Sequence, residues 1–220
     1  MVTLDQVKKN PQVFEFINQT EKILADLSFT DHGLRHANLV SERAGKIAKA
    51  VGLSDREAEL ASIAGFCHDM GNFISRSYHN YFASLLFHQV FQSETDPREL
   101  VIIMQAISNH DKKKEDMAFG NPVSAVAVLA DKSDVHRSRV IAKTIKEVRG
   151  DIHDRVNYAT KSSDLSVKGK KIILTLKIDT KFVSIMEYFE IFTSRMVFCR
   201  KAAEYLGYKF SLMINDFRLL

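Results

Sequence analysis

Six histidine and aspartate side chains fall on the apolar faces of helices predicted from separate parts of this chain. This arrangement constrains the fold more than any other feature of the sequence. A polar side chain on an apolar face costs free energy unless a partner compensates it. We therefore expect the helices to converge so that the six side chains face one another inside the protein. The six are His36, His68, Asp69, His79, His110 and Asp131.

The helices are predicted from apolar residues at helical spacing and from capping residues at their starts. One helix is expected behind Asn10 and Pro11, and the next runs to about Val51. A capping box at Ser54 and Glu57 predicts a third that ends at His68, where Ala61, Ala64 and Gly65 form a stripe that permits close helix contact. Further helices are expected over residues 76–91, 97–110 and 122–135. Together they predict a mainly α fold, with a helical domain over residues 1–150 that carries the six side chains.

The pattern changes after residue 150. Hydrophobic residues alternate at Ile172, Leu174, Leu176 and Ile178, which is the period of a strand. We expect a β-hairpin over residues 165–180, a helix over 183–206 and a last strand over 210–214. Residues 151–220 are therefore predicted to form an α+β extension of ββα-β order, with antiparallel strands, packed on the bundle. A stripe on its helix, Phe189, Phe192 and Met196, is expected to cover the sheet. A homodimer interface is the alternative use of this extension.

Composition excludes several classes of protein. The net charge is only +4, and the basic run 112–114 is followed at once by Glu115 and Asp116, so a solvated loop is expected rather than a nucleic-acid surface. Two cysteines, Cys67 and Cys199, provide neither a disulfide framework nor a thiolate zinc site. No apolar run at the start is long enough for a signal peptide or a membrane span. We expect a cytoplasmic protein.

A metal centre is the simplest compensation for the six converging side chains. One histidine alone would be read as a hydrogen-bonded structural residue, but converging imidazoles and carboxylates need positive charge between them. Nitrogen and oxygen ligands without thiolate suit iron, manganese, zinc or magnesium. His36, His68, Asp69 and Asp131 are expected to hold one ion. His79 and His110 could hold a second, with Asp69 as the bridge, because neighbouring residues at a helix end diverge by roughly 100°.

Two such ions, about 3.5–4 Å apart, could activate a shared hydroxide for attack at phosphorus. Asp69 would then be the central catalytic residue. Lys132 and Arg76 are the cationic candidates for binding phosphoryl oxygens, with Arg137 and Arg139 behind them. Single residues of this kind are more often surface charges. Three further residues could orient ligands or donate a proton: Asp31, His32 and His136.

An enzyme with one metal is an alternative. In it His79 and His110 would contact the substrate or transfer a proton, and would not be ligands.

The motifs around these residues resemble those of the HD superfamily of metal-dependent phosphohydrolases. The resemblance covers roughly residues 30–137 and runs through His36 in His-Ala-Asn-Leu-Val, His68-Asp69 in Ala-Gly-Phe-Cys-His-Asp-Met-Gly, and Asp131 in Val-Leu-Ala-Asp-Lys-Ser-Asp. His79 and His110 look like the additional ligands of its dinuclear branch, which includes bacterial dinucleotide-polyphosphate and cyclic-dinucleotide hydrolases. The resemblance implies an HD-domain helical bundle, iron or manganese as the metal, and a small phosphorylated substrate such as a nucleotide.

The sequence departs from the HD pattern at two positions. Leu39 stands where many members have arginine, and Asn72 stands where a lysine often follows the glycine of the His-Asp motif. The second difference removes a phosphate contact, so the substrate does not transfer from well-known members. It also motivates another hypothesis, in which the chain is a catalytically silent, metal-stabilised sensing or interaction module.

Overall fold

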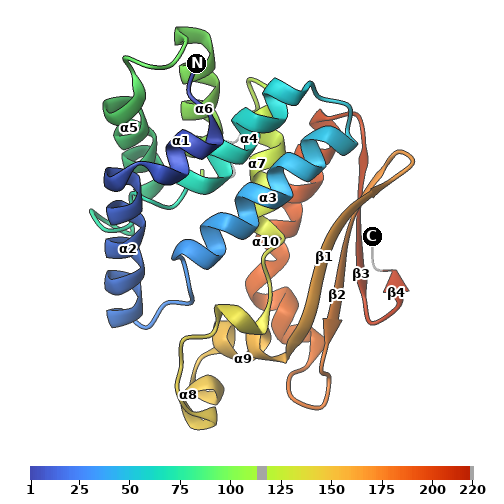
Figure 1. The fold of residues 1–220 in the computed structure, drawn as a ribbon. Helices are drawn as coiled ribbons and strands as arrows, with labels where there is room; N and C mark the ends of the chain where they lie inside the picture. Colours follow the sequence, from blue (N-terminus) through green and yellow to red (C-terminus); the bar gives the residue numbers. More distant parts are fainter. Residues whose placement is uncertain (113–117, 219–220) are drawn as a thin grey trace.

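The computed structural model describes residues 1–112 and 118–218, and most of the basic run and the two acidic residues after it lie outside them. A helical bundle and a small C-terminal sheet lie side by side (Figure 1), which confirms the predicted mainly α class. The helices of the bundle are α1 (Leu4–Lys9), α2 (Pro11–Asp26), α3 (Leu34–Ala50), α4 (Asp55–Cys67), α5 (His79–Phe91), α6 (Pro97–Asn109) and α7 (Pro122–Lys132).

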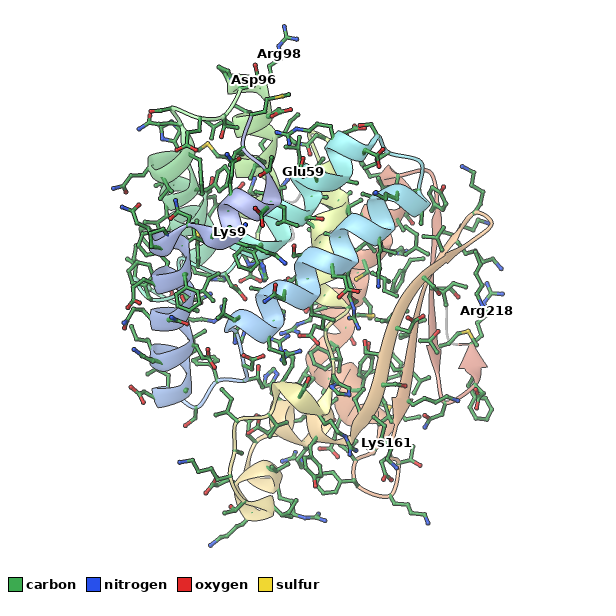
Figure 2. The ribbon with its side chains drawn as sticks, in the orientation of Figure 1. Lys9, Glu59, Asp96, Arg98, Lys161 and Arg218 are labelled. Atoms are coloured by element: carbon green, nitrogen blue, oxygen red, sulfur yellow. The ribbon has the colours of Figure 1, made fainter. Side chains whose placement is uncertain are left out.

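Local capping explains where several helices begin. Ser54 Oγ accepts a hydrogen bond from the Glu57 backbone N–H, and the Glu57 carboxylate accepts one from the Ser54 backbone N–H. Asp96 caps the start of α6, because its side chain accepts hydrogen bonds from the backbone N–H groups of Arg98 and Glu99. Figure 2 shows Asp96 and Arg98 at the edge of the molecule. The short helix α1 was not predicted. It is held by its own capping box and by a hydrogen bond from the Leu4 N–H to Glu59 on α4.

Close packing of α3 on α4 positions the first predicted ligands. A Cβ atom built on Gly65 would lie only 3.0 Å from the Val40 carbonyl oxygen, so the two backbones approach as the small-residue stripe predicts. The predicted boundaries of two other helices were wrong. α5 begins at His79 and not at residue 76, because Tyr78 has a left-handed φ of 64°. α7 ends at Lys132, three residues earlier than predicted.

The C-terminal sheet contains β1 (Thr160–Lys168), β2 (Lys171–Ile178), β3 (Lys209–Ile214) and the two-residue β4 (Phe217–Arg218), in that spatial order. β1 and β2 form the predicted hairpin, and β3 returns parallel to β2 after the helix α10 (Ile185–Tyr205). The ββα-β order is therefore confirmed. The prediction of antiparallel strands is wrong for β3, because α10 crosses over the sheet and brings β3 back in the direction of β2. β1 begins five residues earlier than predicted, because it follows directly from α9 (Ile152–Ala159). Neither α9 nor α8 (Ile145–Gly150) was predicted, and a 3-10 turn, Arg137–Arg139, precedes them.

Helix α7 joins the bundle to the extension. Val126 and Ala130 on one side pack in the bundle core, whereas Val128 and Leu129 pack with α10 and the sheet. Phe192 and Met196 of the predicted stripe are buried in this second core. α10 therefore packs along α7. A domain boundary at residue 150 stays a prediction. Within residues 1–112 and 118–218, none of the helices has the length and apolar character needed to cross a membrane.

Candidate metal centre

The structure brings all six predicted ligands together, from five helices. His36 lies on α3, and His68 and Asp69 directly follow the end of α4. His79 is the first residue of α5, His110 is the C-cap of α6, and Asp131 lies in the last turn of α7. Each residue is less than a tenth exposed. Helix ends and one helix face therefore aim the six side chains at a common point.

The carboxylate of Asp69 divides the six into two groups. Its Oδ2 atom lies 3.1 Å from His68 Nε2 and 3.5 Å from His36 Nε2. Its Oδ1 atom lies 3.2 Å from His79 Nε2 and 3.4 Å from His110 Nε2. Asp131 Oδ1 belongs to the first group, at 3.5 Å from His36 Nε2 and 3.6 Å from His68 Nε2. This is the arrangement that a bridging role for Asp69 requires.

The histidine tautomers are fixed by the nitrogen that faces away from the centre. His68, His79 and His110 each place Nδ1 2.7–2.9 Å from a backbone carbonyl oxygen, and a carbonyl can only accept a proton. His36 Nδ1 lies 2.7 Å from a carboxylate oxygen of Asp134. All four Nδ1 atoms therefore donate, and all four Nε2 atoms point inward, where each can offer its lone pair to a cation. This is the outer hydrogen bonding that metal-binding histidines show.

Facing lone pairs require a cation between them. His36 Nε2 and His68 Nε2 are 3.1 Å apart, and His79 Nε2 and His110 Nε2 are 3.0 Å apart. Two acceptors at that distance repel each other unless a proton or a metal ion lies between them. Ligand atoms about 2.0–2.2 Å from one ion lie roughly 2.8–3.6 Å from one another, so both groups have the spacing of a metal site. The nitrogen and oxygen donors fit a divalent metal ion.

The electrostatics also favour positive charge at this point. Burial opposes a charge on His68, yet Asp69 and Asp131 outweigh it and raise the pKa of this imidazole to about 10. Burial alone would raise the pKa of Asp69, but the histidines around it hold that pKa well below its usual value. For Asp131, Lys132 and His36 overcome the same effect of burial and lower the carboxyl pKa. Both carboxylates therefore remain ionised.

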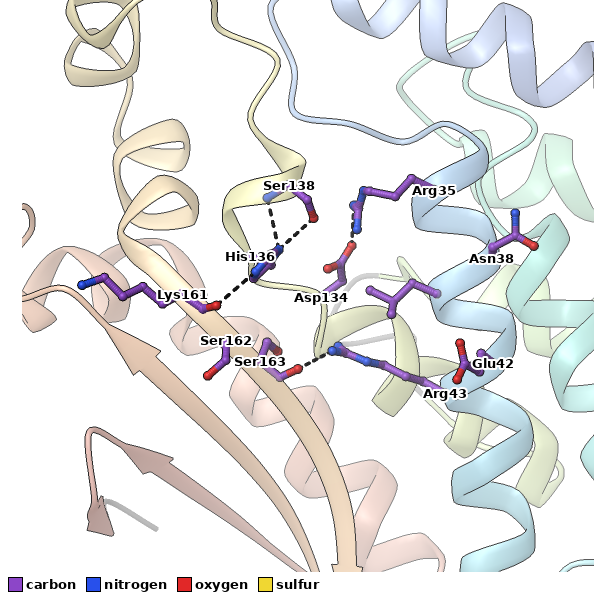
Figure 3. A pocket seen from close by; sticks show the side chains of 11 residues that line it. Arg35, Asn38, Glu42, Arg43, Asp134, His136, Ser138, Lys161, Ser162 and Ser163 are labelled. Atoms are coloured by element: carbon purple, nitrogen blue, oxygen red, sulfur yellow. Dashed lines mark hydrogen bonds and ion pairs between the residues drawn. The ribbon is translucent and has the colours of Figure 1, made fainter.

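Asp134 supports the centre from outside and was not predicted. It follows the end of α7, and its Oδ2 atom accepts from both His36 Nδ1 and Arg35 Nη2, at 2.7 and 2.8 Å. Figure 3 shows Arg35 reaching Asp134 across a pocket of about 550 Å³ between α3 and β1. Arg43 in the same pocket bonds to Ser133 and Ser163. These arginines hold the end of α7 and β1 against α3.

We expect Asp134→Asn to weaken metal binding about 10- to 100-fold, the usual effect of losing an outer-shell partner. The amide keeps the size of the side chain but removes the charge that holds the His36 Nδ1–H. A competition titration against a chelating dye measures the affinity. Asp26→Asn is the matched control, because Asp26 is exposed at the end of α2. Equal affinity in the two variants would contradict a positioning role for Asp134.

Four cationic side chains line the cavity beside the six candidate ligands. Two were predicted, Lys132 and Arg76, and Arg139 was a weaker candidate. The fourth, Arg195 on α10, was not foreseen, and neither was Asp111, whose carboxylate lies 3.3 Å from Lys132 Nζ. Lys132 also lies 2.9 Å from Asp131 Oδ2. The position of Asp111 next to His110 was the only sequence signal for it, whereas nothing in the sequence placed α10 here.

Asn72, at the position where the HD pattern often has lysine, has a structural connection to the centre. Its Nδ2 donates to Asp69 Oδ1 and to the Asp69 carbonyl oxygen, both at 2.9 Å. Its Oδ1 accepts from Arg76 Nη1 at 2.8 Å. Asn72 therefore orients the bridging carboxylate and directs Arg76 toward it. The cation that the motif lacks at residue 72 is present four residues later, at Arg76.

The other residues predicted to orient ligands, donate a proton or bind phosphoryl oxygens lie partly in the cavity and partly around it. His32 lines the cavity, but its Nε2 accepts from Arg139 Nη2 at 3.2 Å, and burial with Arg139 lowers its pKa. Asp31 accepts from the Gly33 N–H and pairs with Arg35, so it holds the start of α3. Two candidates do not line the cavity. His136 contacts Ser138 and the Lys161 carbonyl oxygen, and Arg137 lies over the Tyr158 ring.

Comparisons with known proteins find similarity among solved structures, at low sequence identity. No protein-family model matches the chain, and no curated protein matches it. Among solved structures, the chain is similar to the crystal structure of a predicted HD superfamily hydrolase from an uncultured Thermotogales bacterium. The two are 17% identical, 63% of this chain and 73% of that chain are covered, and the TM-score is 0.45. A match of this kind carries no argument about function, which has to come from the geometry of the site.

Proposed function

We propose that this protein is a metal-dependent phosphohydrolase of the HD type, acting on a phosphoester or phosphoanhydride, with a nucleotide as the expected substrate. The observation that carries the proposal is the pair of facing Nε2 groups joined by Asp69. His36, His68, Asp69 and Asp131 would hold one divalent ion, and Asp69, His79 and His110 a second. When bound, such ions make a nearby water a better nucleophile and polarise a phosphoryl oxygen. By resemblance, iron or manganese is the expected metal.

The charge of the cavity supports an anionic substrate. Four cationic side chains and three carboxylates line it, so cations are already in excess before a divalent ion is added. Lys132 is paired with Asp131 and Asp111. Among the described residues, Arg195 has no hydrogen bond or ion pair, and its guanidinium lies 4.6 Å from the Phe192 ring centroid. An arginine without a carboxylate partner beside a metal centre is suited to binding a phosphoryl group.

The test is turnover of a panel of nucleotides and phosphoesters by protein stripped of metal and reloaded with manganese, iron, zinc or magnesium. We expect release of phosphate or a phosphorylated product that a chelator abolishes and added metal restores. Absence of turnover with every metal and every substrate would refute the proposal. That outcome, together with stoichiometric metal binding, would favour the catalytically silent module.

We expect Arg195→Gln to lower kcat/KM about 30-fold or more, because removing one partner of a desolvated charge pair costs at least ~2 kcal/mol. The loss should fall mainly on KM if the guanidinium binds the substrate before reaction. Arg200→Gln is the matched control, because Arg200 is exposed on the same helix. Steady-state kinetics give kcat and KM for both variants. An Arg195→Gln enzyme as active as the control would show that α10 contributes no substrate contact.

A further inference from the structure

A second pocket adjoins the metal centre at the start of α5. Its volume is about 630 Å³, which is within the usual range of small-molecule sites. Arg76 and Asp111 line both this pocket and the cavity that four of the six candidate ligands line. A ligand that fills the pocket would therefore extend to the edge of the metal centre.

Two exposed aromatic rings line this pocket. Tyr78 is 64% exposed and Tyr81 is 40% exposed, and their ring centroids are 6.3 Å apart. Neighbouring large aromatic side chains left in solvent beside a candidate active site indicate a surface that a ligand covers. A tyrosine ring offers a flat apolar face on which another aromatic ring can stack.

The backbone of Tyr78 strengthens this interpretation. Its φ of 64° lies in the left-handed region, which is costly for a bulky residue and persists mostly where function requires it. The residue stands immediately before α5, and its carbonyl oxygen accepts from the Tyr81 and Phe82 N–H groups. Tyr78 is held outside the helix, where its ring lies beside the pocket, and does not pack in the bundle core.

We propose that this tyrosine pocket, formed around Tyr78 and Tyr81, binds the base of a nucleotide whose phosphate lies at the candidate metal centre. This proposal rests on the proposed function. Arg76 stands between the two ends of such a ligand, held through Asn72. Lys112 adds a second cation at the pocket. Stacking accepts any base, so the pocket favours nucleotides over sugar phosphates without selecting strongly among the four bases.

Calorimetric titration of manganese-loaded protein with the four nucleoside monophosphates and with ribose 5-phosphate tests this pocket. We expect the nucleotides to bind about tenfold more tightly than ribose 5-phosphate, because stacking on an aromatic side chain supplies that much or more. The Tyr78→Leu/Tyr81→Leu variant should lose this preference while its ribose 5-phosphate affinity stays unchanged. Tyr78→Phe/Tyr81→Phe keeps both rings and should retain it. Phe217→Leu, at an exposed aromatic on β4, is the remote control.

Equal affinity of the wild-type protein for nucleotides and ribose 5-phosphate, or binding of neither, would overturn the base-binding role. The same conclusion follows if the double leucine variant behaves like Phe217→Leu. Turnover, measured separately, keeps the two proposals apart. A nucleotide preference without hydrolysis would refute the phosphohydrolase and leave the tyrosine pocket standing, whereas hydrolysis without the preference would do the reverse.

Discussion

Asp69→Asn should abolish hydrolysis, lowering kcat by at least about a thousandfold, and should reduce the metal content per chain. Asp69 is the one side chain whose two oxygens serve both groups of candidate ligands, at 3.1 Å from His68 Nε2 and 3.2 Å from His79 Nε2. The amide cannot place a negatively charged oxygen on each side, so at least one ion loses a ligand and its charge compensation. Elemental analysis of purified protein and steady-state kinetics measure the two effects.

The interpretation of that variant depends on an intact fold. Asparagine has nearly the volume of aspartate, and removing a carboxylate from among four inward-facing imidazoles leaves no cavity. The variant does lose the ion pair between Asp69 and His68, so a lower melting temperature in chelator is expected, and a native circular-dichroism spectrum with a cooperative melting transition shows that the fold is intact. Asp26→Asn, at an exposed residue, should match the wild type in metal content and rate. Full activity in the Asp69→Asn enzyme would exclude the metal centre as the site of reaction.

The convergence of the six candidate ligands could be predicted from the sequence, because helical periodicity fixes the face of the helix on which a residue lies. His36 shares its face with Val40 and Ala44, and both of these residues are completely buried in the structure. A helix whose apolar face must be buried takes any polar residue on that face inward with it. The divergence of the His68 and Asp69 side chains at the end of α4 follows from the same geometry.

The outer parts of the site depend on contacts that periodicity does not specify. Asp134 lies beyond the end of α7, where the predicted helix had been extended to residue 135, so the direction of its side chain could not be derived. Arg195 reaches the cavity because α10 packs on α7 in the second core. The tyrosine pocket depends on one left-handed residue, Tyr78, where a continuous helix was predicted. Each of these is set by long-range packing or by a single backbone torsion.

The sequence left open whether the enzyme uses two metal ions or one. The His79→Gln variant distinguishes these two hypotheses. Glutamine keeps much of the bulk of the imidazole but removes the Nε2 lone pair that faces His110 Nε2 at 3.0 Å. If His79 is a ligand, we expect metal content to fall from two ions per chain to one and kcat to fall about 100- to 1000-fold. His88→Gln, on the same helix and outside the cavity, should change neither quantity.

A one-metal enzyme gives a different pattern for the same pair of variants. Wild-type protein would then hold one ion, and His79→Gln would still hold it, because the first group of ligands is untouched. The loss of a proton-transfer residue would instead remove one limb of the pH profile of kcat while metal affinity stayed constant. The Nδ1 of His79 donates to the Arg76 carbonyl oxygen and its Nε2 lies 3.2 Å from Asp69 Oδ1, which is the geometry of a ligand. We therefore expect the metal content, and not the pH profile alone, to change.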